Sequence, residues 1–275
     1  MTKSYAVIEF SGADAMSFLQ AQLATDLRET VDLQWAWAAL CSLKGRVLGT
    51  GPLARIAGDR WLWLVSASLA TPLSEHLRRY LLRSKVTITI ENRPGLTAQT
   101  SEGAAPSDEQ LQRIEAIGEQ RWVLRDLPPG WNLTLALTSA TDPNADAPTA
   151  DWEAARLAAG MTMLTATSSD QHLSHTLQLQ QLRAVSLSKG CYPGQEIIAR
   201  THYLGRNKRT LAIVSADQTI NESDSISSDG AVVGSIIEAI PGGEAIAAVS
   251  IAALEKTTWQ VGETPLQWRK TAITD

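Results

Sequence analysis

Cysteine is scarce in this chain of 275 residues, which contains only Cys41 and Cys191. Two thiols so far apart in the sequence exclude a disulfide-stapled scaffold and indicate a reducing compartment. Neither cysteine belongs to a pair with the spacing of a metal site, and an iron–sulfur cluster normally takes more thiolates than this chain supplies. We therefore expect no metal site, and any contact with a cluster would be transient or shared with ligands from a partner.

Long hydrophobic runs and an excess of positive charge are also missing. No stretch approaches the roughly 18 uncharged apolar residues of a membrane-spanning helix. Glu9 and Asp14 interrupt the apolar N-terminal segment, so we predict no signal peptide. The net charge of -5 argues against a membrane-surface binder and against strong direct nucleic-acid binding, although it allows a local basic patch. We expect a cytoplasmic protein.

With 44% hydrophobic residues, the chain is long enough for two domains with separate cores. Alternation and helical spacing predict strands at 5–10, 35–41, 47–57, 61–65 and 86–90, and helices at 13–25 and 152–159. Another helix is expected to open at Thr71-Pro72, with proline in its first turn. Residues 100–107 and 140–150 are predicted as surface loops. This alternation indicates an α+β sheet covered by helices on one face.

The pattern changes after residue 206. Short strands are predicted at 210–214, 225–228, 231–237 and 245–251, separated by Asp-Gly and Pro-Gly-Gly turns. Such a run of short strands is typical of a small β-barrel. We predict a first domain over residues 1–205 and a barrel domain over residues 206–275, with the boundary near Gly205.

The most informative stretch reads Lys-Gly-Cys-Tyr-Pro-Gly-Gln-Glu from Lys189 to Glu196 and ends at Arg200. A thiol, an amine, a carboxylate and a guanidinium lie close together, and glycines and a proline interrupt any helix or strand pattern. This composition is typical of a site. We call residues 189–200 the signature.

The signature resembles that of the YgfZ family, folate-binding proteins of iron–sulfur metabolism related to the glycine-cleavage aminomethyltransferase (T-protein). The family pattern is Lys-Gly-Cys, an aromatic residue, a variable position, Gly-Gln-Glu and a later Arg, and every fixed position is matched. Residues 18–26 and 44–46, and Arg156 before Gly160, resemble the same family. The resemblance implies an aminomethyltransferase-like folate-binding module, followed by the barrel, with tetrahydrofolate or a derivative between them.

Cys191 is the candidate reactive centre, with Lys189 as its catalytic neighbour. A nearby ammonium and free backbone amides favour the thiolate and make it nucleophilic or redox-active. The alternative is a small buried hydrophobe, which the resemblance disfavours. A catalytic dyad with His202, the nearest histidine in sequence, is disfavoured because no triad can be assembled around it.

Five residues are candidate folate ligands: Gln178, Tyr192, Gln195, Glu196 and Arg200. A carboxylate such as Glu196 can accept two hydrogen bonds from the aminopyrimidinone edge of a pterin. Glu196 and Arg200 are also spaced as an ion pair on a helix surface, and that alternative stays open.

Basic residues outnumber acidic ones between positions 189 and 209. They are Lys189, Arg200, Arg206, Lys208 and Arg209, against Glu196 alone. The carboxylates of a folate tail, or RNA phosphate, would find complementary charge here. A solvated stretch between domains is the alternative.

Transferase chemistry is disfavoured at one place. In T-protein the strand after the second aromatic run carries a carboxylate credited with assisting attack, whereas residues 65–70 here read Val-Ser-Ala-Ser-Leu-Ala. Serine or alanine cannot replace a general acid or base without losing most of the rate it supplies. Whether the chain is an enzyme therefore stays open.

The resemblance implies a folate-binding protein that supports assembly or repair of iron–sulfur enzymes, including tRNA-modifying ones. Its partners would be those enzymes or cluster-assembly proteins. A folate-dependent aminomethyl or one-carbon transferase and a folate-free interaction protein are the alternatives.

Overall fold

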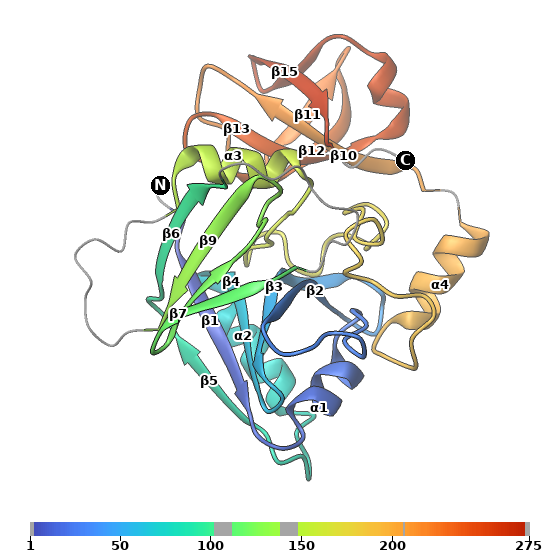
Figure 1. Cartoon of the computed structure of the whole chain (residues 1–275). Coiled ribbons are helices and arrows are strands. Elements are labelled where there is room, and N and C mark those ends of the chain that lie inside the picture. The colour runs from blue at the N-terminus through green and yellow to red at the C-terminus, as the bar shows by residue number, and fades with distance from the viewer. Residues whose placement is uncertain (1–2, 102–111, 138–147, 206, 273–275) are drawn as a thin grey trace.

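The described part of the chain forms three β-sheets, one of them closed into a barrel (Figure 1). The structure is a computed structural model and describes residues 3–101, 112–137, 148–205 and 207–272. In the view of Figure 1 the barrel lies at the top and the first sheet at the bottom, with the second sheet beside them.

The first sheet is antiparallel, with the strand order β2-β3-β4-β1-β5. Its strands are β1 (Tyr5–Ser11), β2 (Gln34–Cys41), β3 (Val47–Ala57), β4 (Arg60–Ser66) and β5 (Thr87–Glu91). Helix α1 (Ala15–Gln22) follows β1, and α2 (Ala67–Arg78) packs across β1, β4 and β5. Trp37, Trp61 and Trp63 are fully buried in this core. The strands predicted from alternation are confirmed to within a few residues.

Both predicted helices of this part need correction. α1 is shorter than expected because Leu23 adopts an extended conformation and ends it. α2 begins at Ala67, so Pro72 lies inside the helix and not in its first turn. Pro72 removes one backbone hydrogen bond, but burial of Leu69 and Leu73 on the sheet outweighs that loss.

The second sheet was not resolved by the sequence analysis. Its order is β6-β9-β8-β7, with β6 (Gly95–Thr100), β7 (Ile114–Gly118), β8 (Arg121–Leu124) and β9 (Trp131–Ala136). Helix α3 (Ala150–Ala158) follows, and the Thr149 hydroxyl caps it by accepting a hydrogen bond from Trp152 N. Most of the predicted loops at 100–107 and 140–150 lie outside the described residues.

The C-terminal part is a closed barrel in the order β10-β13-β12-β11-β14-β15. Its strands are β10 (Arg209–Ser215), β11 (Ser225–Ser228), β12 (Ala231–Ala239), β13 (Glu244–Ser250), β14 (Trp259–Val261) and β15 (Thr264–Lys270), with a 3-10 turn at Ile251–Glu255. The predicted α+β fold with a C-terminal barrel is confirmed. Strands β14 and β15 were not predicted, and the boundary near Gly205 stays a prediction.

No helix within the described ranges is both long enough and apolar enough to cross a membrane.

Candidate functional site: the signature and an interdomain cleft

Lys189 ties the signature to the end of α1. Its buried ammonium donates hydrogen bonds to three backbone carbonyls: Gln20 O at 2.6 Å, Leu23 O at 2.8 Å and Thr25 O at 2.8 Å. Carbonyls at the C-terminal end of a helix have no partner within the helix, and the helix dipole favours a cation there. The three contacts therefore use all three N–H donors of the ammonium.

The environment of Lys189 also changes its acidity. Burial lowers the pKa of Lys189 from 10.5 to about 8, and the nearby Asp26 carboxylate only partly opposes this effect. The amine is thus both enclosed and fully bonded by main-chain oxygens. The catalytic role assigned to it from the sequence stays a prediction, and its geometry in this structure is that of a positioning residue.

The rest of the signature holds its own backbone in place. The Gln195 amide donates to Lys189 O at 3.0 Å, and the Tyr192 hydroxyl donates to Ser186 O at 2.9 Å. Gly194 has φ +82, and a Cβ there would lie 2.4 Å from Ser42 O, so the loop needs glycine to pack on the β2–β3 turn. Cys191 is exposed on this fixed loop.

The remaining predicted ligands, Gln178, Glu196 and Arg200, make no hydrogen bond with Lys189 among the described residues. Helix α4 (Gln195–Leu204) carries Glu196 and Arg200 exposed on its surface, and no ion pair joins them in the part of the chain that the structure describes. Gln178 lies in the segment between α3 and α4 and contacts the barrel side of the molecule. Its amide donates a hydrogen bond to Thr210 Oγ1 at 3.2 Å and accepts one from Thr271 Oγ1 at 3.1 Å. The structure brings Lys189, Tyr192 and Gln195 together. None of the five candidate ligands is among the residues that line the two hollows described below.

A cleft of about 810 Å³ lies between the first sheet and the barrel. The N-terminal end of β1, the start of α2, the segment after α3 and two barrel loops form its walls. Its lining residues are Lys3, Ser4, Tyr5, Ser66, Ser68, Met163, Thr165, 219–222 and 238–243. None of the seven residues predicted as catalytic or ligand-binding is among them. Residues 65–70, which have no carboxylate where T-protein has one, contribute Ser66 and Ser68 to the lining of the cleft.

A buried charge network closes one side of the cleft. The Arg156 guanidinium, fully buried, bonds Glu153 at 2.6 Å and Glu238 at 2.5 Å. Lys3 also pairs with Glu238, and the Tyr5 hydroxyl donates to Glu153. Burial alone would raise the pKa of Glu238, but Arg156 and Lys3 hold it below its ordinary value. The network therefore joins β1, α3 and β12 through paired charges.

The pKa of Glu222, in the same cleft, is shifted in the opposite direction to that of Glu238. It is half-buried and accepts a hydrogen bond from Thr165 Oγ1 at 2.5 Å, and among the described residues it forms no salt bridge. Burial raises the pKa of Glu222, while Thr165 and the more distant Lys3 only partly oppose that shift. The cleft thus contains one carboxylate paired with cations and one, Glu222, that accepts hydrogen bonds from Thr165 and the Ala239 backbone without a salt bridge in the described residues.

Lys3, Glu222 and Glu238 were not predicted from the sequence as site residues. No local motif joins them, because the contact between Lys3 and Glu238 spans almost the whole chain. One signal was present: Glu238 is a lone charge at the end of the apolar strand β12. A charge in a buried strand needs a partner.

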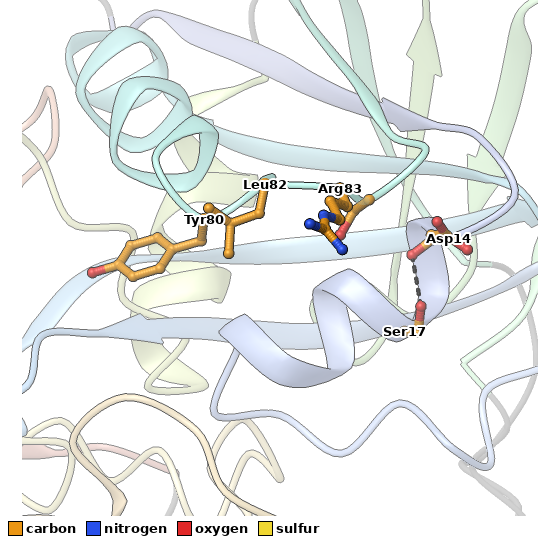
Figure 2. Close-up of a pocket in the computed structure, with 6 residues that line it drawn as sticks. Asp14, Ser17, Tyr80, Leu82 and Arg83 are labelled. Carbon is orange, nitrogen blue, oxygen red and sulfur yellow. Dashed lines mark hydrogen bonds between the residues drawn. The ribbon is translucent and has the colours of Figure 1, made fainter.

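A second hollow, shown in Figure 2, lies between the start of α1 and the end of α2 and has a volume of about 750 Å³. Asp14 and Ser17 line it on one side and Tyr80, Leu82 and Arg83 on the other, and in Figure 2 the Tyr80 ring extends away from Asp14. The Asp14 carboxylate already accepts a hydrogen bond from Lys85 N at 2.7 Å. The barrel contributes none of the lining residues of this hollow, so it does not match the ligand position expected between the first part of the chain and the barrel, and it is the weaker candidate. In the described parts of the chain, no group of three or more metal-binding side chains gathers.

The fold defines a class. The chain superposes on the crystal structure of the glycine cleavage system aminomethyltransferase T from Bartonella henselae with a TM-score of 0.71, covering 98% of this chain and 83% of that one at 16% identity. The predicted aminomethyltransferase-like fold is therefore confirmed. No family model matches the sequence.

Curated relatives are more similar in sequence. The tRNA-modifying protein YgfZ of Escherichia coli O157:H7 is 30% identical over 226 residues, which cover 75% of this chain and 68% of the relative. The protein of the same name from Shigella boydii serotype 4 is 29% identical over 228 residues, with the same coverage. The chain belongs to the YgfZ family, as the signature indicated.

Proposed function

We propose that the chain binds a reduced folate, tetrahydrofolate or a derivative, in the cleft between the first sheet and the barrel. We further propose that it acts in tRNA modification by supporting the assembly or repair of iron–sulfur enzymes. Family membership and the aminomethyltransferase fold support the proposal. The observation that carries the choice of site is the cleft itself, which combines apolar residues with the Glu222 carboxylate, a group that forms no salt bridge among the described residues.

The residues of the cleft fit a folate. Its volume of about 810 Å³ lies within the roughly 300–1,000 Å³ of small-molecule sites. Met163, Ile220 and Ile240 offer apolar contact to a flat ring. When bound, a reduced folate supplies a carrier for a one-carbon unit.

Glu222 is the residue we assign to the pterin edge. An ionised carboxylate accepts two parallel N–H bonds, which matches the donor pair of an aminopyrimidinone. Glu238 is less suited because Arg156 and Lys3 already occupy its oxygens. Glu222 takes the part that the sequence analysis gave to Glu196.

Binding without transfer is the favoured activity. Ser66 and Ser68 lie in the cleft, and their hydroxyls hydrogen-bond to each other at 2.9 Å. Ser68 also accepts a hydrogen bond from Ala166 N at 3.1 Å. Hydroxyls held in this way offer no general acid or base of ordinary strength.

A folate-dependent aminomethyl or one-carbon transferase is the second candidate, because a half-buried carboxyl with a raised pKa, such as Glu222, is typical of catalytic sites. Turnover of a methylene donor to tetrahydrofolate, lost in Glu222→Gln, would support it. No turnover in a sensitive assay would remove it.

We propose that Cys191 is the thiol that contacts the iron–sulfur enzymes or the cluster-assembly proteins. It is exposed on a loop fixed by Lys189, Tyr192 and Gln195, whereas Cys41 is buried. Burial raises the pKa of Cys41 to about 12, so this second thiol serves as an internal control. Iodoacetamide should label Cys191 and spare Cys41 in the folded protein.

The function is tested with two measurements on wild type and Cys191→Ala. We expect tetrahydrofolate to bind both equally in calorimetry, and only wild type to support a cluster-dependent tRNA-modifying enzyme in cells. Equal support by both proteins would remove the role of the thiol. No heat with any reduced folate, together with a co-purifying partner enzyme, would favour a folate-free interaction protein.

A further inference from the structure

Helix α4 stands at the margin of the molecule and buries little of its surface. In Figure 1 it lies at the right edge, beside the end of β2. Ile198 is its only buried residue. Ile197, Tyr203 and Leu204 are exposed by 38%, 70% and 81%. A helix that leaves such side chains in water has a face available for a partner.

The turn between β2 and β3 extends this face. Gly45 lies against Ile197, and Gly194 packs on Gly45, so the turn and the first turn of α4 form one surface. Lys44 is exposed on that turn. At the other end of the helix, Lys208 and Arg209 follow within a few residues and are exposed too.

Positive charge accumulates on this surface, which we call the α4 face. Its cations are Lys44, Arg200, Lys208 and Arg209. Its exposed acids are Glu196, on the helix itself, and Asp170, whose carboxylate accepts a hydrogen bond from Ser42 Oγ on the β2–β3 turn. None of the four cations forms a salt bridge within the described residues, whereas Arg55, Arg60 and Arg269 elsewhere do. In a chain of net charge -5, this local excess is complementary to an anionic partner.

Aromatic side chains accompany the cations. Tyr203 packs edge-on against His202 at 4.9 Å, and His202 lies 5.6 Å from His175, measured between ring centroids. Arg200 lies one turn from both Ile197 and Tyr203, so it separates the exposed apolar side chains. Cations interleaved with exposed rings suit a single-stranded nucleic acid, whose phosphates pair with the cations and whose bases stack on the rings.

We propose that the α4 face binds a single-stranded segment of tRNA, with its phosphates on Lys208, Arg209 and their neighbouring cations and a base on Tyr203. The inference rests on the proposed function in tRNA modification. It places the RNA beside Cys191, which precedes α4 in the same signature. Because only a few cations contribute, binding is local and strongly dependent on salt.

The test is fluorescence anisotropy with a labelled, unmodified tRNA transcript, between ~50 and ~200 mM salt. Lys208→Gln/Arg209→Gln should weaken binding by about tenfold and reduce the salt slope by about two, since each lost phosphate contact reduces it by about one. Tyr203→Ala should weaken binding by a similar factor with an unchanged slope. Arg79→Gln/Arg83→Gln, which removes equal charge from exposed positions after α2, is the matched control and should change affinity less than about twofold.

Several results would overturn the inference. Absence of tRNA binding by wild type, or equal loss in both double variants, would show that the α4 face is not an RNA site. Unchanged RNA affinity with a weaker affinity for tetrahydrofolate in Lys208→Gln/Arg209→Gln would assign the cations to a folate tail. Unchanged affinity for both ligands would assign the face to a protein partner. Wild type that binds tRNA but no reduced folate would refute the proposed folate function and leave this inference standing.

Discussion

Two groups of charged residues in this protein differ in burial and in pairing. At the cleft, Arg156 and Glu238 are fully buried and pair with each other and with further charges. On the α4 face, Lys208 and Arg209 are exposed, and no salt bridge holds them within the described part of the chain. Buried charges must be paired to be tolerated, whereas exposed unpaired charges cost little.

The buried charges stabilise the fold, whereas the exposed charges are placed to bind a partner. The buried network links β1, α3 and β12, so it fixes the relative position of the first sheet and the barrel that form the cleft. The α4 face contributes little to the core and is free to meet a partner. Substitutions in the first region should change stability, and substitutions in the second should change binding alone.

The largest expected effect comes from Arg156→Met. It leaves the buried Glu153 without a cation and the buried Glu238 with Lys3 alone, and breaking a buried pair in this way costs about 3–5 kcal/mol. Urea denaturation should measure this loss in the free energy of unfolding. Lys256→Met, which breaks the exposed pair with Asp229, is the control and should cost less than about 1 kcal/mol. Similar losses in both variants would contradict the role given to the network.

The next effect concerns pH and the cleft. Because burial raises the pKa of Glu222, this carboxyl takes up its proton at a higher pH than an ordinary glutamate. Affinity for a ligand that needs the ionised form should therefore fall as the pH falls through that raised pKa. Calorimetric titrations with 5-formyltetrahydrofolate at several pH values would measure it. In Glu222→Gln the affinity should lose this dependence, whereas Glu263→Gln, on an exposed barrel turn, should keep it.

A smaller effect should appear at alkaline pH. The pKa of Lys189 is lowered from 10.5 to about 8 in the folded chain. Between these values the unfolded chain binds more protons than the folded one, so the contribution of Lys189 to stability rises with pH across that window. Thermal unfolding at pH 8 to 10.5 should show this rise in wild type and lack it in Lys189→Met. The same rise in both proteins would mean that burial does not lower the pKa of Lys189 in the folded chain.

The smallest expected change is in the free energy of unfolding when two cations of the α4 face are removed. Lys208→Gln/Arg209→Gln should alter the free energy of unfolding by less than about 0.5 kcal/mol, as is usual for surface substitutions. The same urea measurement used for Arg156→Met gives the value. A loss of several kcal/mol would show that these cations stabilise the fold and are not reserved for a partner.

The sequence predicted the first sheet and much of the barrel because their strands alternate and end at recognisable turn residues. It placed the start of α2 wrongly, since the position of Pro72 suggested a first turn, whereas burial of Leu69 against the sheet extends the helix. The second sheet was not resolved because its strands β7 and β8 are short. Local propensity cannot override such tertiary contacts.

The site was predicted only in part for the same physical reason. The signature was recognisable from its residues, and the structure shows it as a braced loop with Cys191 exposed. The carbonyls that hold Lys189 lie more than 160 residues away in the sequence. Glu222 and Glu238 likewise meet Thr165 and Lys3 only after folding. No spacing in the sequence indicates such contacts.

One measurement tests the central claim, the location of the folate site, most directly. Tetrahydrofolate is titrated into wild type, Glu222→Gln and Glu196→Gln under the same conditions. We predict that Glu222→Gln lowers the affinity by about tenfold or more, as expected for the loss of hydrogen bonds to a charged group, and that Glu196→Gln binds like wild type. Loss of affinity in Glu196→Gln with wild-type binding in Glu222→Gln would contradict the account and return the ligand to the signature.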